Sequence, residues 1–228
     1  MNIAIIPARI GSTRLPKKNI KLFYKKPIIS YAIEEAKKTK LFRKIIVSTD
    51  SNEIKKISEF YGAEVPYLRP KYLSDNKIHF NESIKHMIKW LFKKKLYPKN
   101  VCCIYPTSPL LDYRQLIQGY KKLKKKNNFI FSACAYRSPP QRGFYLKNDK
   151  VKLFSKRNYN RRSQTLKEIY HDAGQFYWGK TENWIKEKII FNSNSSIIKI
   201  PYLQFIDINY KDDWYIAEQL YKLKKKLK

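Results

Sequence analysis

The sequence predicts an α/β fold in which helices cover a mainly parallel sheet. Short apolar runs typical of buried strands occur at residues 3–6, 44–49 and 101–105. Segments with apolar residues at helical spacing lie between them, most clearly at 28–36 and 84–92. Because such alternation builds parallel sheets with crossover helices, we expect a three-layer domain. Its ligands should bind outside the carboxyl ends of the strands.

The first elements follow from local signals. The apolar run at 3–6 ends at Pro7, which cannot extend the pairing of a central strand. Pro27 suits the first turn of the helix over 28–36. The strand at 44–49 comes next, so a strand–helix–strand unit is expected at the amino end.

Polar residues mark the next boundaries. Asp50 or Ser51 should cap the helix that follows the second strand, and capping is the favoured role of Asp50. Asp50 also ends a strand, where it could line a ligand crevice. The helix over 84–92 and the strand at 101–105 continue the alternation.

The second half of the chain extends this pattern and then interrupts it. A helix over 116–123 leads to a strand at 129–136. From 137 to 175, prolines, short extended pieces and polar turns replace the alternation, which predicts an inserted arm. A strand at 197–200 and a helix over 212–222 complete the chain.

Composition limits the class of protein. The chain has 228 residues, enough for one sizeable core, so we expect a single domain over 1–228. No apolar run approaches the roughly 18 residues of a membrane span, and the amino end lacks a signal-peptide pattern. Cys102, Cys103 and Cys134 lie in strand-like runs and indicate free thiols. We therefore expect a cytoplasmic protein with no membrane contact.

The formal net charge of +31 raises the alternative of a nucleic-acid-binding module. The excess lysine is spread along the whole chain, however, and runs such as 224–226 fall at the ends of amphipathic helices. No recognition helix with interleaved base-reading side chains is evident. We interpret the charge as solvated faces that could steer anionic substrates, and we predict no nucleic-acid partner.

The loop after the first strand carries the main site signal. Gly11 and Ser12 allow backbone N–H groups to approach an anion, and Arg9, Arg14 and Lys18 add positive charge. The spacing fits neither a Walker A loop nor a Gly-x-Gly-x-x-Gly motif. Such a loop could cradle a triphosphate. From spacing alone, a solvated turn is an equal alternative.

The order Ala-Arg-x-Gly-Ser-x-Arg-x-Pro-x-Lys-Asn over residues 8–19 resembles the signature loop of cytidylyltransferases that activate 2-keto acid sugars. In that family the loop holds the phosphates of CTP. Ile10 and Thr13 depart from the family pattern, and Arg14 could supply the charge that Thr13 lacks. The resemblance implies a Rossmann-like fold of the nucleotide-diphospho-sugar transferase type.

Two further segments carry the resemblance. The Pro-Thr-Ser-Pro element at 106–109 is similar to one that lies between nucleotide and sugar in the sialic acid enzymes, although a turn would also explain it. The segments 101–106 and 170–179 resemble the pseudaminic acid branch. The resemblance implies nucleotide binding by Arg9, Gly11, Ser12, Arg14, Lys18, Asn19, Arg69, Pro106, Thr107 and Ser108. It implies sugar binding by Tyr105, Arg142, His171, Asp172 and Gln175.

Near the carboxyl end, the family has an Asp-x-Asp element that carries magnesium. This chain keeps Asp207 but has Asn209 at the second position. An amide oxygen can coordinate Mg²⁺ without adding charge, so the implied ligands are these two residues, substrate phosphates and water. A helix-flanking carboxylate is the alternative for Asp207. The implied catalytic set is Arg9, Arg14, Lys18 and Asp207.

The implied reaction is transfer of CMP from CTP to pseudaminic acid, with Mg²⁺ as cofactor and pyrophosphate as the second product. Its place would be cell-surface glycan biosynthesis, such as flagellin glycosylation. The partners are then CTP and an acidic nine-carbon sugar, and N-acetylneuraminic or legionaminic acid is the nearer alternative sugar. In the family an arm like 137–175 embraces a second subunit, which implies a homodimer.

Overall fold

The computed structural model describes residues 1–75, 78–123, 127–186 and 189–226. Its central sheet has the strand order β10-β6-β9-β5-β1-β4. The strands are β1 (Asn2–Pro7), β4 (Lys44–Ser48), β5 (Asn100–Ile104), β6 (Phe129–Ala135), β9 (Tyr170–Lys180) and β10 (Ser195–Lys199). β9 runs antiparallel to both of its neighbours, and every other pairing in this sheet is parallel. The predicted mainly parallel sheet is confirmed.

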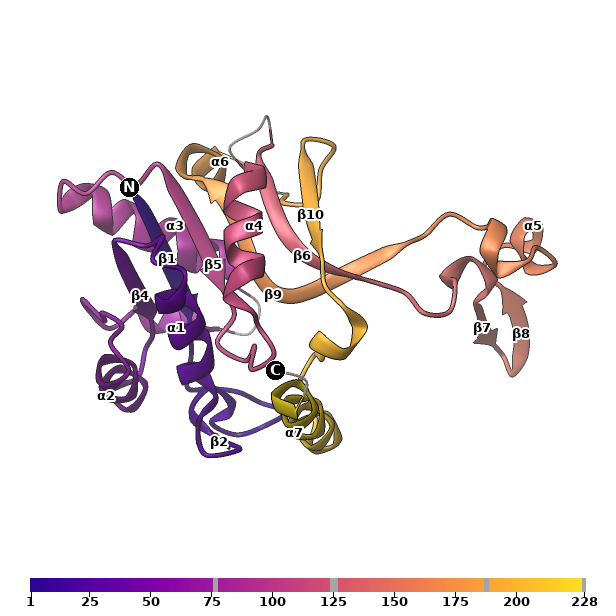
Figure 1. Cartoon of the computed structure of the whole chain (residues 1–228), viewed down its shortest axis with the longest axis horizontal. Coiled ribbons are helices and arrows are strands. Elements are labelled where there is room, and N and C mark those ends of the chain that lie inside the picture. Colours follow the sequence, from indigo (N-terminus) through magenta and orange to yellow (C-terminus); the bar gives the residue numbers. More distant parts are fainter. Residues whose placement is uncertain (76–77, 124–126, 187–188, 227–228) are drawn as a thin grey trace.

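Helices cover both faces of this sheet, as Figure 1 shows. They are α1 (Ile28–Lys38), α2 (Asn52–Phe60), α3 (Phe80–Lys93), α4 (Tyr113–Leu123) and α6 (Thr181–Lys186), whereas α7 (Lys211–Lys226) lies off the sheet. Side chains alternate along β1, so Ala4 and Ile6 pack with α1, α2 and α4 on one face. Ile3 and Ile5 pack with α3 and α6 on the other. The three-layer arrangement is therefore confirmed.

A third apolar cluster attaches α7 to the amino half of the chain. Trp214 and Ala217 of α7 are buried against Phe23 and Leu15. Short elements surround this cluster and the site: η1 (Lys18–Ile20), β2 (Leu22–Phe23), β3 (Lys26–Pro27), η2 (Lys71–Ser74) and η5 (Tyr202–Gln204). The last helix thus packs beside the loop that follows β1, although the two are about 200 residues apart in the chain.

The predicted arm leaves the sheet between β6 and β9 and extends away from it (Figure 1). It contains η3 (Pro140–Arg142), β7 (Phe144–Lys147), β8 (Lys150–Leu153), α5 (Lys156–Tyr159) and η4 (Ser163–Thr165). The expected insert of 137–175 reaches further than this, because residues 170–175 already pair with β6 or lie in β9. Among the described residues, no helix combines the length and apolar character needed to cross a bilayer.

The capping prediction for Asp50 is wrong. Ser51 caps α2, since its Oγ accepts hydrogen bonds from the N–H groups of Glu53 and Ile54. The Asp50 carboxylate instead accepts a hydrogen bond from Ile10 N at 3.1 Å. Asp50 precedes the capping residue by one position, and its side chain contacts the loop after β1 instead of the end of the helix. Asp50 therefore supports the loop rather than the helix.

Candidate active site

The loop after β1 is held in a defined shape by its neighbours. Asp50 accepts from Ile10 N at 3.1 Å, and Asn19 Nδ2 donates to the Arg9 carbonyl at 2.8 Å. Arg9 Nη1 reaches across to the Ser74 carbonyl at 3.1 Å. These contacts hold the loop against the end of β4 and against the segment around η2. The basic side chains of the loop therefore lie at the carboxyl ends of the strands.

A cavity of about 270 Å³ opens at the carboxyl ends of β1 and β5. Several predicted residues line it: Arg9, Ser12, Arg14, Lys18, Asn19, Arg69, Tyr105, Pro106 and Thr107. Four of these carry positive charge, and they come from segments up to about 60 residues apart. The position agrees with the expectation that ligands lie outside the carboxyl ends of parallel strands. Such a cavity suits a polyanion.

Arg69 lines this cavity although its side chain is only 5% exposed. Its guanidinium donates to Ser83 Oγ at 2.8 Å and to Ser74 Oγ at 3.0 and 3.2 Å. Burial lowers the pKa of Arg69, and the charge of Asp50 acts in the opposite direction. Because hydroxyl groups hold the cation without neutralising it, Arg69 keeps its charge for an anionic or carbonyl-bearing ligand.

Lys18 connects the loop to the carboxyl-terminal segment. Its Nζ donates to the Ile208 carbonyl at 2.5 Å. Burial lowers the pKa of Lys18, the Asp207 carboxylate raises it, and the charges of Arg14 and Arg9 lower it again. Asp207 therefore lies close enough to interact with the cations of the cavity, from more than 180 residues away in the chain.

Asp207 and Asn209 lie on the segment that enters α7. Asn209 Nδ2 donates to Asp207 Oδ2 at 2.7 Å, which leaves the amide oxygen of Asn209 as the atom that could bind a cation. In the part of the chain that the structure describes, no three His, Cys, Asp or Glu side chains form a metal-binding group. One carboxylate and one amide oxygen nevertheless fit Mg²⁺, which takes its other ligands from phosphates and water.

A polar and aromatic group borders the cavity on the side of β9. Tyr105 lines the cavity, and its phenol interacts with the Tyr177 hydroxyl, which donates to Asp172 Oδ2. Exclusion of water by the surrounding protein raises the pKa of Asp172, and the nearby charge of Asp207 adds to this effect. His171 lies between the rings of Tyr136 and Phe205. This border could hold a polar ligand beside aromatic faces.

Comparison with known proteins places this geometry in a family. A family model described as Cytidylyltransferase matches residues 3–226. The chain belongs to the cytidylyltransferase family. A pseudaminic acid cytidylyltransferase of Campylobacter jejuni is 40% identical to it over 97% of each chain. An N-acylneuraminate cytidylyltransferase of Escherichia coli is 29% identical over 94% of this chain and 51% of its own length.

A solved structure supports the fold of this cytidylyltransferase. A CMP:2-keto-3-deoxy-manno-octonic acid synthetase complexed with CTP superposes with a TM-score of 0.73 at 14% identity. The likeness covers 98% of this chain and 99% of that one. At this identity the comparison bears on architecture, and it confirms the predicted Rossmann-like nucleotidyltransferase fold.

Some predicted site residues of the cytidylyltransferase are not brought to the cavity. Gln175 is 4% exposed, and its amide donates to the Gln204 carbonyl at 2.6 Å, so it packs under η5. Arg142 lies in the arm, because the insert carries it away from the sheet (Figure 1). Gly11 and Ser108 adjoin lining residues without lining the cavity themselves. The predicted sugar-binding residues His171 and Asp172 and the predicted metal ligands Asp207 and Asn209 also lie outside its lining.

Sequence reasoning missed residues that support the cytidylyltransferase site. Phe80 and Ser83 line the cavity from the first turn of α3, and Ile78 lines it from just before that helix. Ser83 is buried on the same helical face as Met87, and a small polar residue on an otherwise apolar face could have indicated a polar contact. The role of Asp50 has no such signal, because Ile10 lies 40 positions earlier in the chain.

Proposed function

We propose that this protein transfers CMP from CTP to the anomeric hydroxyl of pseudaminic acid and releases pyrophosphate. The observation that carries the proposal is the convergence of Arg9, Arg14, Lys18 and Arg69 on one cavity, with Asp207 next to Lys18. The sugar is inferred from the Campylobacter jejuni relative, which is 40% identical over almost its whole length.

This reaction requires the enzyme to position the sugar oxygen against the α-phosphorus and to stabilise negative charge on the phosphates. The sugar oxygen forms a bond to the α-phosphorus of CTP, the bond from that phosphorus to the oxygen of the pyrophosphate breaks, and the hydroxyl proton is released. Arg9, Arg14 and Lys18 line the wall where the phosphates would lie, so they would stabilise charge on the departing pyrophosphate. Ser12 and Asn19 would orient the nucleotide from the same loop.

We propose Mg²⁺ as the cofactor, held by Asp207 and the amide oxygen of Asn209. When bound, Mg²⁺ offsets negative charge on the phosphates. Lys18 Nζ donates a hydrogen bond at 2.5 Å to the carbonyl of Ile208, which lies between Asp207 and Asn209 in the sequence. The same lysine would thus keep the metal-binding segment next to the phosphate-binding loop.

The sugar would bind beside Tyr105, Asp172 and His171. The Tyr105–Tyr177–Asp172 contacts orient a carboxylate at the border of the cavity, where it could accept hydrogen bonds from sugar hydroxyl or amide groups. Gln175 and Arg142 are not assigned to the sugar of the same subunit, because Gln175 is buried under η5 and Arg142 lies in the arm.

We infer a homodimer from the arm. In the β7–β8 hairpin, Leu146 pairs with Val151 and Phe144 with Leu153, so one face of the hairpin is apolar. Phe144, Leu146 and Val151 are each more than half exposed in the single chain. An isolated two-stranded hairpin is marginally stable in water, and a second copy would bury this face.

The reaction is assigned to the cytoplasm, where thiols stay reduced. Cys102, Cys103 and Cys134 are free and buried, which suits that compartment. The activated sugar would serve cell-surface glycan biosynthesis, including flagellin glycosylation. This biosynthetic role is inferred from the proposed product, a CMP-activated sugar.

One assay tests the proposal. The protein is incubated with CTP, Mg²⁺ and, in turn, pseudaminic, legionaminic and N-acetylneuraminic acid, and phosphate is measured after pyrophosphatase treatment. Pseudaminic acid should give the highest kcat/KM, and Arg9→Ala should lower turnover by at least about tenfold. Preference for another acid would change the sugar assignment. Salt-sensitive binding of RNA or DNA without CTP turnover would favour the nucleic-acid module instead.

A further inference from the structure

Helix α7 contacts two segments that lie close to the cavity, the one with Asp207 and the one that follows β5. At its amino end, Asp213 Oδ2 accepts hydrogen bonds from the backbone N–H groups of Asn209 and Tyr210, each at 2.8 Å. Near its carboxyl end, Lys224 reaches the segment that follows β5. The two side chains are about 16 Å apart along the helix axis. One rigid helix therefore joins the segment of Asp207 to the segment that follows β5.

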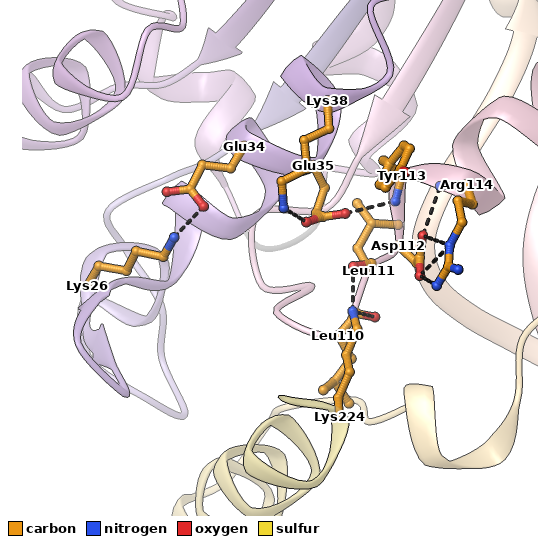
Figure 2. A network of polar contacts seen from close by, with 10 residues as sticks. All are labelled: Lys26, Glu34, Glu35, Lys38, Leu110, Leu111, Asp112, Tyr113, Arg114 and Lys224. Carbon is orange, nitrogen blue, oxygen red and sulfur yellow. Dashed lines mark hydrogen bonds and ion pairs between the residues drawn. The ribbon is translucent and has the colours of Figure 1, made fainter. Parts of the chain in front are cut away.

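The contact of Lys224 is with backbone carbonyls. Its Nζ donates to the carbonyls of Leu110 and Leu111, both at 2.8 Å (Figure 2). These carbonyls lie three and four residues beyond Thr107, which lines the cavity. A charged donor shared by two consecutive carbonyls restrains the direction of the chain more than a single neutral hydrogen bond would. Lys224 thus restrains the backbone at residues 110 and 111, just beyond the cavity wall.

Two more groups hold the far end of this segment, also shown in Figure 2. Glu35 of α1 accepts a hydrogen bond from Tyr113 N at 2.8 Å. Asp112 is 2% exposed and accepts from Arg114 N and Nε at 2.9 and 3.0 Å. Burial opposes the charged form of Asp112, but Arg114 and the charge of Lys224 outweigh it and lower its pKa to about 2. The segment is anchored from α1, α4 and α7.

The anchoring matters because the segment follows a cavity wall. Tyr105, Pro106 and Thr107 all line the cavity, and the backbone enters the anchored stretch directly after them. The apolar cluster around Trp214 keeps α7 from shifting as a whole. Movement of residues 106–111 would therefore change the distance between this wall and the Asp207 segment, which leads into the amino end of the same helix.

We propose that Lys224 is a positioning residue: through the Leu110 and Leu111 carbonyls it holds the cavity wall at 105–107 at a fixed position relative to the Asp207 segment. The role in turnover rests on the proposed function, whereas the restraint of residues 106–111 does not. Lys224 is not among the residues that line the cavity, so its proposed action on the reaction is indirect.

The test compares Lys224→Met with Lys222→Met, which removes the same charge from an exposed position of the same helix. Hydrogen–deuterium exchange is measured over peptides covering 105–113 and 8–19. In Lys224→Met, the backbone amides of 105–113 should exchange at least about tenfold faster than in the wild type, and those of 8–19 should exchange at the wild-type rate. In Lys222→Met, both peptides should exchange at the wild-type rate. Equal exchange in the two variants would overturn the proposal. If Lys224→Met does not fold, Lys224→Gln and Lys222→Gln replace the pair.

Kinetics test the consequence for the reaction. In Lys224→Met, kcat with pseudaminic acid should fall at least about tenfold, while the Kd of CTP with Mg²⁺ changes less than about twofold. Lys224→Arg, which keeps a charged donor, should recover most of the loss. A purely structural role predicts a lower Tm with kcat unchanged at a temperature where the variant is folded. Absence of turnover in the wild type would refute the proposed function, and the exchange comparison would still decide the restraint.

Discussion

Lys18 is the side chain on which the proposed site depends most directly. It lines the cavity with Arg9 and Arg14, and its Nζ donates to the Ile208 carbonyl at 2.5 Å. Lys18→Met keeps most of the apolar stem and removes the charge and the hydrogen bond. Both the loop after β1 and the Asp207 segment should then lose a common restraint.

The size of the effect follows from this contact. A hydrogen bond to a charged group contributes about 1.5–3 kcal/mol, so its loss in the transition state lowers kcat/KM by roughly 10- to 150-fold. Burial lowers the pKa of Lys18 below its ordinary 10.5, so its charge is lost at a lower pH than that of an exposed lysine. CTP affinity should therefore decline as pH rises through this lowered pKa, and Lys18→Met should lack that decline.

Lys17→Met is the matched control. Lys17 is adjacent in the loop, but its side chain is 61% exposed and pairs with Glu53 at 2.8 Å on the surface. Such pairs contribute about 0–1 kcal/mol, so the control should stay near wild-type kinetics. The assay is pyrophosphate release at varied CTP and pH, with Tm measured for each variant. Equal kcat/KM in Lys18→Met and Lys17→Met would refute the role of Lys18.

Three further outcomes are expected. Asn209→Asp places a second carboxylate beside Asp207 and should lower the Mg²⁺ concentration that gives half-maximal turnover, since Mg²⁺ binds carboxylates well; an unchanged value would argue against a metal at this position. Asp112→Asn should reduce the free energy of unfolding in neutral solution. Because the folded pKa of Asp112 is about 2 against 3.8 ordinarily, this difference should be complete above about pH 5 and disappear as pH falls toward 2 in denaturant titrations. Leu146→Lys on the apolar face of the arm should give a monomer in sedimentation velocity, whereas Tyr145→Lys on the opposite face should remain a dimer; a dimer in both would place the interface elsewhere.

Much of the fold could be predicted because its signals are local. The run at 3–6 reads as a buried strand and becomes β1, and the helical spacing over 28–36 becomes α1. Periodicity records which faces are buried, and burial drives these elements together. The limit of the arm was harder to place, because residues 170–175 carry both polar turn residues and the start of β9.

The basic loop of the candidate site could also be predicted from the sequence, since Gly11, Ser12 and their basic neighbours follow a strand directly. The supports of that loop were not. Asp50 has the residue type and position of a helix cap, and a cap would satisfy the same side chain. Its actual acceptor role depends on how β4 lies beside β1, which local propensity does not encode.

The sequence by itself therefore determined the alternation of strands and helices and the chemical character of the loop after β1, because both depend on residues close together in the chain. Only the tertiary structure decided that Lys18 meets the Asp207 segment, that Lys224 holds the wall behind Thr107, and that Gln175 is buried under η5. These contacts join residues about 30 to 190 positions apart. They exist because packing of the whole sheet and of α7 brings those segments together.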